Sequence, residues 1–287
     1  MKIVVTGPAG FVGTHLRAGL GEAFVPYEGD VLDSDAVREA VRGADAVVHL
    51  AAQASVAASW EDAFQSWRVN VDGTVCVLEA VRAERPEARV LVTSTCEVYG
   101  NASRIPSPED ERIAPVSPYA ASKAAAELAC LVSGLDVVVT RATNHGGPGQ
   151  DERFAVGSWT RQIARLEAEG GGTLRVGDLS AERDFLDVRD VCRAYRLLLE
   201  PSVAAGTYNV ASGKTVTMAK VVELLVGLAR VPVRVEPDEA RMRPADIPRL
   251  SGDPSKLRAA TGWEPQISLE QTLADTLAAA REMEPVS

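Results

Sequence analysis

The sequence predicts an α/β protein built on a doubly wound parallel sheet, with a smaller second lobe toward the C-terminus. Short β-branched runs alternate with longer helical stretches through the first half of the chain, which is the pattern of a parallel sheet. Runs such as Val137-Val-Val contain no alternating polar residues, as expected for strands covered on both faces. A glycine-rich turn separates the first strand-like run from the first helical stretch, as tight βα connections require.

Each predicted strand of the first half is a short β-branched run, and each predicted helix is a longer stretch between two such runs. The predicted strands are Lys2–Thr6, Ala23–Val25, Ala46–Leu50, Val90–Thr95 and Val137–Ala142. The predicted helices are Phe11–Leu20, Asp33–Arg42, Trp60–Ala83 and Pro118–Leu131.

The pattern changes after Asn144, where His145-Gly-Gly-Pro-Gly-Gln150 interrupts regular structure. We therefore expect residues 1–145 to form the sheet domain and residues 146–287 mainly the second lobe, with 184–212 returning to the sheet. The elements predicted here are helices Val156–Glu169, Arg189–Leu199, Met218–Ala229 and Leu269–Met283, strand Thr173–Val176 and loop Arg241–Arg249.

The composition excludes several classes of protein. A formal charge of −10 over 287 residues disfavours general nucleic-acid binding. No apolar run approaches the ~20 residues that cross a bilayer, and no signal peptide follows Met1, so we expect a cytoplasmic protein without membrane partners. The four cysteines and three histidines lack the spacing of a disulfide framework or a metal site.

The glycine-rich turn predicts nucleotide binding. Gly7, Gly10 and Gly13 lie between the first strand and the first helix, where glycines permit a tight turn and close approach of the backbone to a pyrophosphate. The intervening Phe11 and Val12 begin the helix, whose free N–H groups attract the anion. We expect all five residues to contact a dinucleotide.

The second strand bears on the choice between NAD and NADP. Glu28 follows this strand one residue later than the usual ribose-binding acid, and no Arg or Lys lies between Arg17 and Arg38. The absence of a basic residue in this segment slightly favours NAD over NADP. Asp30 and Val31 are expected near the adenine, whereas Asp33 is expected to cap the next helix.

The third strand ends at His49-Leu50-Ala51-Ala52-Gln53, where small residues let a ligand approach the backbone. Leu50, Ala51 and Ala52 are expected to contact the cofactor, and Gln53 the substrate. We interpret His49 as a hydrogen-bonded core residue rather than a catalyst.

Three residues predict proton-transfer chemistry. Tyr119 and Lys123, four residues apart on a predicted helix, share one face. A cation beside a phenol lowers the phenol pKa toward the working pH. Thr95 ends the fourth strand at the ligand-binding edge of the sheet, where its hydroxyl is expected to hold the reacting oxygen.

Together these motifs resemble the extended short-chain dehydrogenase/reductase family, with Asn70-Val-Asp-Gly-Thr74 as a further match. The resemblance covers essentially the whole chain. It implies a Rossmann domain with bound NAD(P), a Thr95–Tyr119–Lys123 catalytic set and a nucleotide-sugar substrate. In this family two helices pack into a four-helix dimer interface, which implies a homodimer through Trp60–Ala83 and Pro118–Leu131.

The second half is most similar to GDP-4-dehydro-6-deoxy-D-mannose reductases. This similarity rests on the segments beginning at Asn144, Val176 and Arg243. It implies that Asn144, Arg183 and Arg243 contact the diphosphate, that Val156 contacts the nucleobase, and that Cys96 and Glu97 lie at the substrate.

The sequence is compatible with both a reductase and a dehydratase. A 4,6-dehydratase needs a second acid/base, usually a Glu preceded by Asp or Ser, and here Cys96 precedes Glu97. Glu97 keeps dehydration open, while Cys96 and the short chain favour reduction of GDP-4-keto-6-deoxy-D-mannose to GDP-D-rhamnose or its 4-epimer. A nucleotide-sugar epimerase also stays open, as does, outside the enzymes, a nucleotide-binding sensor, which typically lacks the Tyr or Lys.

Overall fold

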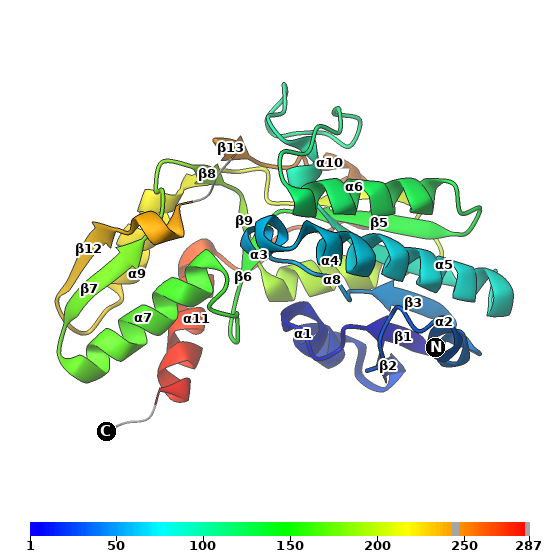
Figure 1. The fold of residues 1–287 in the computed structure, drawn as a ribbon, viewed down its shortest axis with the longest axis horizontal. Coiled ribbons are helices and arrows are strands. Elements are labelled where there is room, and N and C mark those ends of the chain that lie inside the picture. The colour runs from blue at the N-terminus through cyan, green and yellow to red at the C-terminus, as the bar shows by residue number, and fades with distance from the viewer. Residues whose placement is uncertain (243–246, 285–287) are drawn as a thin grey trace.

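Six parallel strands form the central sheet (Figure 1). A computed structural model describes residues 1–242 and 247–284. The sheet strands are β1 (Ile3–Thr6), β2 (Phe24–Tyr27), β3 (Ala46–His49), β4 (Arg89–Thr95), β5 (Val137–Ala142) and β10 (Gly206–Val210). Their spatial order is β10-β5-β4-β3-β1-β2, and all neighbours are parallel. The predicted doubly wound α/β fold is confirmed.

The strands are buried on both faces, which explains why their sequences lack polar alternation. In β1, Ile3 and Val5 enter one apolar core, whereas Val4 enters the other. Helices cover both faces of the sheet (Figure 1). They are α1 (Phe11–Leu20) and α8 (Val188–Leu198) on one face, and α2 (Ser34–Val41), α5 (Gly73–Glu84) and α6 (Pro118–Leu131) on the other.

The prediction of a single long helix over Trp60–Ala83 is wrong. The chain instead forms α3 (Val56–Glu61), α4 (Ala63–Trp67), a π-helical segment (Arg68–Asp72) and α5. The break occurs at Asp62, whose carboxylate accepts a hydrogen bond from the Gln65 amide at 2.9 Å and caps α4. The second strand is also displaced, because a 3₁₀ turn at Gly21–Ala23 delays its start.

The second lobe packs helices against short strands around its own apolar core. Its helices are α7 (Ala155–Glu169), α9 (Met218–Gly227) and α11 (Leu269–Met283), and its paired strands are β7 (Gly172–Val176) and β12 (Val233–Pro237). Shorter pairings involve β6 (Asn144–Gly146) with β9 (Phe185–Asp187), and β8 (Glu182–Arg183) with β11 (Val216–Thr217) and β13 (Arg249–Leu250). These strands of two or three residues leave no periodic signal in the sequence.

Part of the C-terminal half packs with the central sheet. Strand β10 pairs with β5, and α8 contributes to the same core as α1; both lie within the segment 184–212 expected to return. Helix α10 (Ser255–Thr261) and Trp263 also join this core, which the sequence did not indicate. The division into domains stays a prediction.

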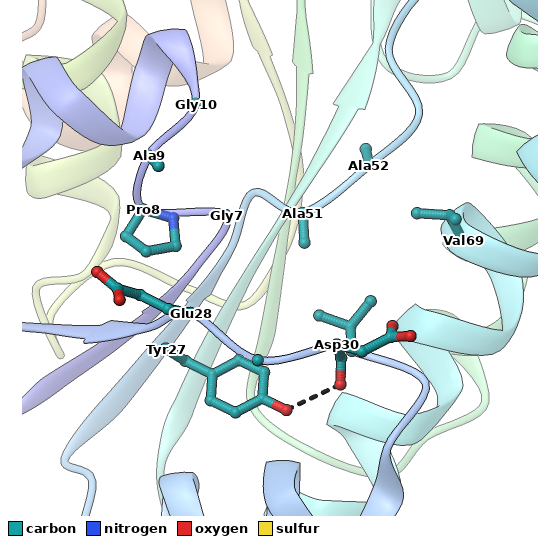
Figure 2. A pocket seen from close by; sticks show the side chains of 12 residues that line it. Gly7, Pro8, Ala9, Gly10, Tyr27, Glu28, Asp30, Ala51, Ala52 and Val69 are labelled. Atoms are coloured by element: carbon teal, nitrogen blue, oxygen red, sulfur yellow. Dashed lines mark hydrogen bonds between the residues drawn. The ribbon is translucent and has the colours of Figure 1, made fainter.

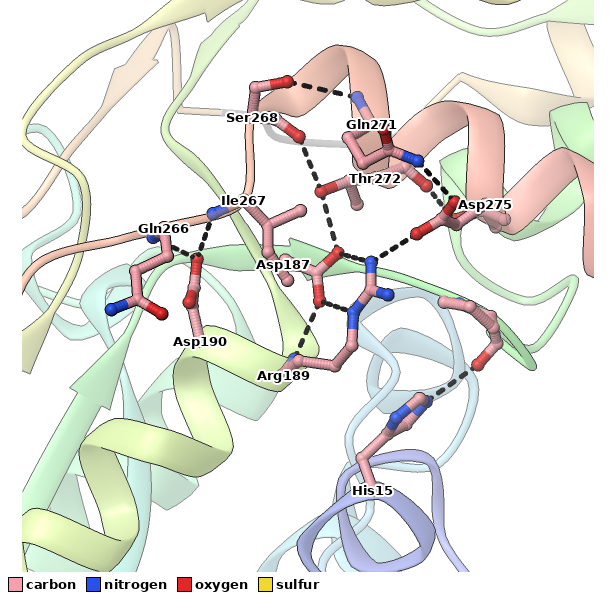
Figure 3. A network of polar contacts seen from close by, with 12 residues as sticks. His15, Asp187, Arg189, Asp190, Gln266, Ile267, Ser268, Gln271, Thr272 and Asp275 are labelled. Carbon is pink, nitrogen blue, oxygen red and sulfur yellow. Dashed lines mark hydrogen bonds and ion pairs between the residues drawn. The ribbon is translucent and has the colours of Figure 1, made fainter. Parts of the chain in front are cut away.

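Buried acidic side chains at the start of α8 tie that helix to the second lobe (Figure 3). Asp187 pairs with Arg189 at 2.7 Å, and Arg189 also pairs with Asp275 of α11 at 2.6 Å. The Asp190 carboxylate accepts hydrogen bonds from the Gln266 and Ile267 amides at 2.8 and 2.9 Å. The lobes are therefore joined by charge-assisted contacts as well as by apolar packing.

Candidate active site

A cavity of about 600 Å³ opens where β1, β2 and β3 end (Figure 2). This carboxyl edge is where open α/β sheets bind their ligands. The lining residues are Gly7, Pro8, Ala9, Gly10, Tyr27, Glu28, Gly29, Asp30, Val31, Ala51, Ala52 and Val69.

The glycine turn fits a dinucleotide because larger residues would close it. Gly7 has φ +67°, and a Cβ there would lie 2.8 Å from the Ala51 amide nitrogen. A Cβ at Gly13 would lie 2.6 Å from the Gly7 carbonyl oxygen. Helix α1 has no acidic residue in its first turn and no side-chain cap at Gly10, so its terminal N–H groups suit an anion such as a pyrophosphate.

Gly13→Ala is expected to weaken binding of reduced nicotinamide cofactor about tenfold, because displacing the turn costs about 1–3 kcal/mol. A fluorescence titration of the bound nicotinamide measures the dissociation constant. The matched control is Gly19→Ala in the same helix, where a Cβ meets no atom within 4 Å. Equal affinities for the two variants would contradict this role of Gly13.

Six predicted cofactor residues line the cavity: Gly7, Gly10, Asp30, Val31, Ala51 and Ala52. Phe11, Val12 and Gly13 begin α1, and Leu50 directly follows β3. Asp33 caps α2 by accepting the Ala36 amide hydrogen bond at 3.1 Å, as predicted. The adenine contact of Asp30 stays a prediction.

Sequence reasoning missed the contribution of Tyr27. Its hydroxyl donates to the Asp30 carbonyl at 2.8 Å and folds the segment after β2 around the cavity (Figure 2). Tyr27 pairs in register with Thr6, the residue before the glycine turn. A predicted strand that ended at Tyr27 instead of Val25 would have placed this side chain beside the glycine turn. Pro8, Ala9 and Val69 were also missed.

The predicted catalytic residues come together beside β4. Tyr119 and Lys123 are 9% and 5% exposed on the inner face of α6, and the Thr95 hydroxyl, at the end of β4, lies near enough to the Tyr119 phenol to lower its pKa. The Lys123 ammonium donates to the Thr93 carbonyl at 2.7 Å. One strand thus binds the Lys123 ammonium and places the Thr95 hydroxyl near the Tyr119 phenol.

Neighbouring side chains place the start of α6. Ser117 caps the helix by accepting from the Ala120 amide at 3.1 Å, and the Ser59 hydroxyl accepts from the Tyr119 amide at 3.1 Å. Ser59 is fully buried in α3. The backbone of Tyr119 is therefore fixed by a second element as well as by its own helix.

The predicted direction of the Tyr119 pKa is wrong. Burial, followed by the Glu97 charge, raises the pKa of Tyr119, while the nearby Thr95 hydroxyl opposes this rise. Burial lowers the pKa of Lys123 to about 8. In the protein alone, the phenol therefore holds its proton at neutral pH, which suits a proton donor.

His49 is a hydrogen-bonded core residue, as predicted. It is 2% exposed, and its ring nitrogens lie 2.8 Å from the Thr6 hydroxyl and 3.2 Å from the Thr74 hydroxyl. Burial and the charge of Lys123 lower the pKa of His49 to about 3. The imidazole is therefore neutral at physiological pH.

Cys96 does not lie where the family resemblance implied. Its side chain is fully buried, and its thiol donates to the Arg141 carbonyl at 3.2 Å. A 3₁₀ turn over Cys96–Tyr99 directs the thiol into a small apolar cluster. Glu97, the next residue, is near enough to Tyr119 to raise the phenol pKa.

Three of the remaining expected substrate residues lie on different elements. Asn144 lies on β6 and Val156 is buried in the core of the second lobe, so a nucleobase contact by the Val156 side chain is not supported. Arg183 is 6% exposed and donates to the Ile247 carbonyl at 2.6 Å. Arg243 lies outside the described residues.

Gln53 lies immediately after Ala52 and is held by its backbone. Its amide donates to the Asn70 side-chain oxygen at 2.8 Å, and its carbonyl accepts from the Asn70 amide nitrogen at 3.1 Å. The side-chain oxygen of Gln53 is buried and has no hydrogen-bond partner within the described part of the chain. A ligand donor would satisfy it.

Other classes of site find no support in residues 1–242 and 247–284. No group of three or more His, Cys, Asp or Glu is arranged to hold a metal ion there, and the four cysteines are free. None of the helices in this part of the chain combines the length and apolarity that a bilayer crossing requires.

Comparison with known proteins identifies the family. The family model described as GDP-mannose 4,6 dehydratase matches residues 17–276. A GDP-6-deoxy-D-mannose reductase from Pseudomonas aeruginosa is 38% identical, with 95% of this chain and 94% of the relative covered. The structure of RMD from Pseudomonas aeruginosa complexed with NADPH is 35% identical, with a TM-score of 0.89 and coverage of 98% and 99%.

A Thermus thermophilus UDP-glucose 4-epimerase solved with NAD is also similar. It is 30% identical, with a TM-score of 0.84 and coverage of 99% of this chain and 100% of the epimerase. The family-model match and the reductase similarity each cover most of the sequence. The chain therefore belongs to the GDP-mannose 4,6-dehydratase family of extended short-chain dehydrogenases/reductases.

Proposed function

We propose that this protein reduces the C4 ketone of a nucleotide-linked 4-keto-6-deoxy sugar, with GDP-4-keto-6-deoxy-D-mannose as the substrate and GDP-D-rhamnose or its 4-epimer as the product. The observation that carries the proposal is the buried Thr95–Tyr119–Lys123 set, which lies at the same carboxyl edge of the parallel sheet as the glycine-lined cavity. The 38% identity to a GDP-6-deoxy-D-mannose reductase supports the choice of substrate.

Each residue of this set has a distinct role. NAD(P)H supplies the hydride that C4 receives. Tyr119 donates its phenolic proton to the ketone oxygen, which its raised pKa allows because the phenol is protonated at neutral pH. Thr95 hydrogen-bonds the same oxygen and keeps it in line with the phenol. Lys123 binds the nicotinamide ribose and offers positive charge as the phenol loses its proton.

A 4,6-dehydratase is the second candidate, and one observation favours it. Glu97 lies near enough to raise the Tyr119 pKa, so a second acid/base stands by the phenol. Cys96 weakens this candidate because its buried thiol faces the Arg141 carbonyl and burial raises the pKa of Cys96 well above its usual value. We therefore favour the reductase.

Two incubations separate these functions. The protein is supplied with GDP-mannose plus NAD⁺ or NADP⁺, or with GDP-4-keto-6-deoxy-D-mannose plus NADH or NADPH, and cofactor absorbance and sugar products are followed. The reductase oxidises cofactor only in the second mixture. A 4-keto sugar formed from GDP-mannose without added reductant would establish the dehydratase instead. Cofactor binding with no turnover of either sugar would support a sensor.

We propose NADH as the preferred cofactor. The carboxylates of Glu28 and Asp30 line the cavity (Figure 2), and no lysine or arginine stands among the described residues that line it. Carboxylates suit the ribose hydroxyls of NAD and repel the extra phosphate of NADP. The similar structures contain either NADPH or NAD and so favour neither cofactor, and the proposal rests on the carboxylates that line the cavity.

The value of kcat/KM for NADH is accordingly expected to exceed that for NADPH about tenfold, a difference of about 1.4 kcal/mol. Glu28→Gln should lower the ratio of kcat/KM for NADH to kcat/KM for NADPH, because it removes one negative charge that repels the extra phosphate of NADPH. Initial rates with each cofactor measure the preference. A higher kcat/KM for NADPH in the unaltered protein would overturn it.

We further propose a cytoplasmic homodimer. Large exposed apolar side chains gather on α3, α4, α5 and α6, which pack against one another. They are Trp60, Phe64, Trp67, Val75, Leu128 and Leu131, with Val132 directly after α6. Such a surface is typical of a protein interface. It coincides with the helices that the family resemblance implied.

Light scattering at micromolar concentration is expected to give the mass of a dimer. The double substitution Leu128→Glu with Leu131→Glu should give a monomer, because it places like charges in the interface. Leu228→Glu, at an exposed leucine after α9, is the control and should remain dimeric. Monomer alone in the unaltered protein would refute the dimer.

A further inference from the structure

A buried chain of hydrogen bonds runs from the cofactor cavity to the catalytic helix. The Ala51 amide, in the cavity lining, donates to the Thr6 hydroxyl at 3.2 Å. The Thr6 hydroxyl lies 2.8 Å from Nδ1 of His49, and Nε2 of the same ring lies 3.2 Å from the Thr74 hydroxyl. The Thr74 hydroxyl donates to the Asn70 carbonyl at 2.7 Å.

Each hydroxyl has only one proton to donate. This fixes which partner donates and which accepts in every hydrogen bond of this series. Thr74 uses its proton on the Asn70 carbonyl, so its oxygen must accept from Nε2 of His49. A neutral ring that carries its proton on Nε2 has Nδ1 free to accept. Thr6 therefore donates to Nδ1 while accepting from the Ala51 amide. The tautomer of His49 is Nε2–H.

Asn70 continues the chain to α6. Its side-chain nitrogen donates to the Ser122 hydroxyl at 2.9 Å, and Ser122 donates to the Tyr119 carbonyl at 2.7 Å. The Asn70 side chain also holds both backbone groups of Gln53. Because Ser122 has used its proton, the orientation of the Asn70 amide is fixed as well.

The five side chains in this series of hydrogen bonds are buried, which makes the series sensitive to any missing partner. Thr6, His49, Asn70, Thr74 and Ser122 are each at most 2% exposed. Loss of one buried partner leaves a polar group without a hydrogen bond, at a cost of about 1–3 kcal/mol. At the cavity end, the Ala51 amide nitrogen packs so closely on Gly7 that a Cβ there would lie 2.8 Å from it. A displacement of Ala51 would therefore also displace the glycine turn.

We propose that His49, held as the Nε2–H tautomer, is a positioning residue that couples the floor of the cofactor cavity to the helix carrying Tyr119 and Lys123. His49 is not among the described residues that line the cofactor cavity. Its donor and acceptor face two hydroxyls that cannot exchange roles, so it sets the relative placement of β1, β3 and the start of α5. The coupling rests on the proposed function, whereas the tautomer does not.

The tautomer is tested by ¹⁵N NMR of the side chains of the unaltered protein. There are only three histidines, and loss of one signal set in His49→Asn assigns the ring. Nε2 is expected to show a bonded hydrogen and Nδ1 none, unchanged between pH 6 and 8. A hydrogen on Nδ1, or a rapidly exchanging mixture, would overturn the proposal.

The coupling is tested with single hydroxyl deletions. Thr6→Val should raise the dissociation constant for NADH about tenfold, and Thr74→Val should lower kcat about tenfold with a smaller effect on cofactor affinity. Thr276→Val is the matched control, since Thr276 is 2% exposed in α11 and its hydroxyl donates to the Thr272 carbonyl at 2.6 Å, outside this series of hydrogen bonds. It should change stability while leaving both constants within about twofold of the unaltered values.

The outcomes are distinguishable. If Thr6→Val and Thr276→Val alter cofactor binding equally, His49 has only a structural role and the coupling is refuted. His49→Gln, which keeps an N–H donor toward Thr74, should retain more kcat than His49→Leu. If the unaltered protein binds no nicotinamide nucleotide, the proposed function fails and the coupling with it, while the NMR result still decides the tautomer.

Discussion

Replacing Tyr119 by phenylalanine is expected to lower kcat about 10³-fold, because the ketone oxygen then has no proton donor. Binding of reduced cofactor should remain within about twofold, since the backbone contacts of Tyr119 with Ser59 and Ser122 do not use the phenol. Steady-state rates with the 4-keto sugar and a fluorescence titration of NADH measure the two quantities.

The matched control is Tyr208→Phe. This change removes a hydroxyl that donates to the Ala204 carbonyl from β10, away from the cavity. Its kcat should stay near that of the unaltered protein. Full activity of Tyr119→Phe would show that another group delivers the proton, and Glu97 would then be the first residue to replace.

Replacing Glu127 by alanine is expected to lower the free energy of unfolding by about 3–5 kcal/mol. Glu127 and Arg141 form an ion pair at 2.6 Å in which both side chains are only 6% exposed. The Ser94 hydroxyl also contacts the Glu127 carboxylate. Without Glu127, the Arg141 charge remains buried without its partner, which is costly in a medium of low polarity.

Urea denaturation measures this change, and two further variants interpret it. Glu127→Leu combined with Arg141→Met should recover much of the loss, because no unpaired charge remains. Glu223→Ala, which breaks the exposed pair of Glu223 with Lys220, should cost less than about 1 kcal/mol. A loss below about 1 kcal/mol for Glu127→Ala would mean that water reaches Arg141.

The Glu127–Arg141 ion pair also helps to position the candidate catalytic residues. Arg141 donates to the Tyr99 hydroxyl and to the Glu109 carbonyl, each at 3.0 Å. Tyr99 ends the turn that starts directly after Thr95. Glu127 lies one turn beyond Lys123 on α6. The pair therefore fastens the strand end that carries Thr95 to the helix that carries Tyr119 and Lys123.

The sheet and the cofactor turn were predictable because their signals are local. Uninterrupted β-branched runs identify strands buried on both faces, and a glycine turn between strand and helix identifies the nucleotide edge. The pairing of Tyr119 with Lys123 follows from helical spacing alone. These features depend on neighbours within a few residues.

The remaining features depend on residues far apart in the chain or on single contacts. The helix break at Asp62 depends on one capping hydrogen bond, which the periodicity of apolar residues does not reveal. The inward direction of the Cys96 thiol follows from the turn after β4 and from its partner Arg141 on β5. The pKa of Tyr119 reflects burial and Glu97, which helical spacing could not show.

The central claim is that this chain moves a hydride from its cofactor to C4 of a 6-deoxy sugar. The most direct measurement supplies GDP-4-keto-6-deoxy-D-mannose with NADH carrying deuterium at the transferable position, and locates the label in the product by mass spectrometry and NMR. We predict one deuterium per molecule, at C4 of a 6-deoxyhexose. The contrary result is no label from the cofactor, together with migration of deuterium from C4 to C6 when GDP-[4-²H]mannose is supplied.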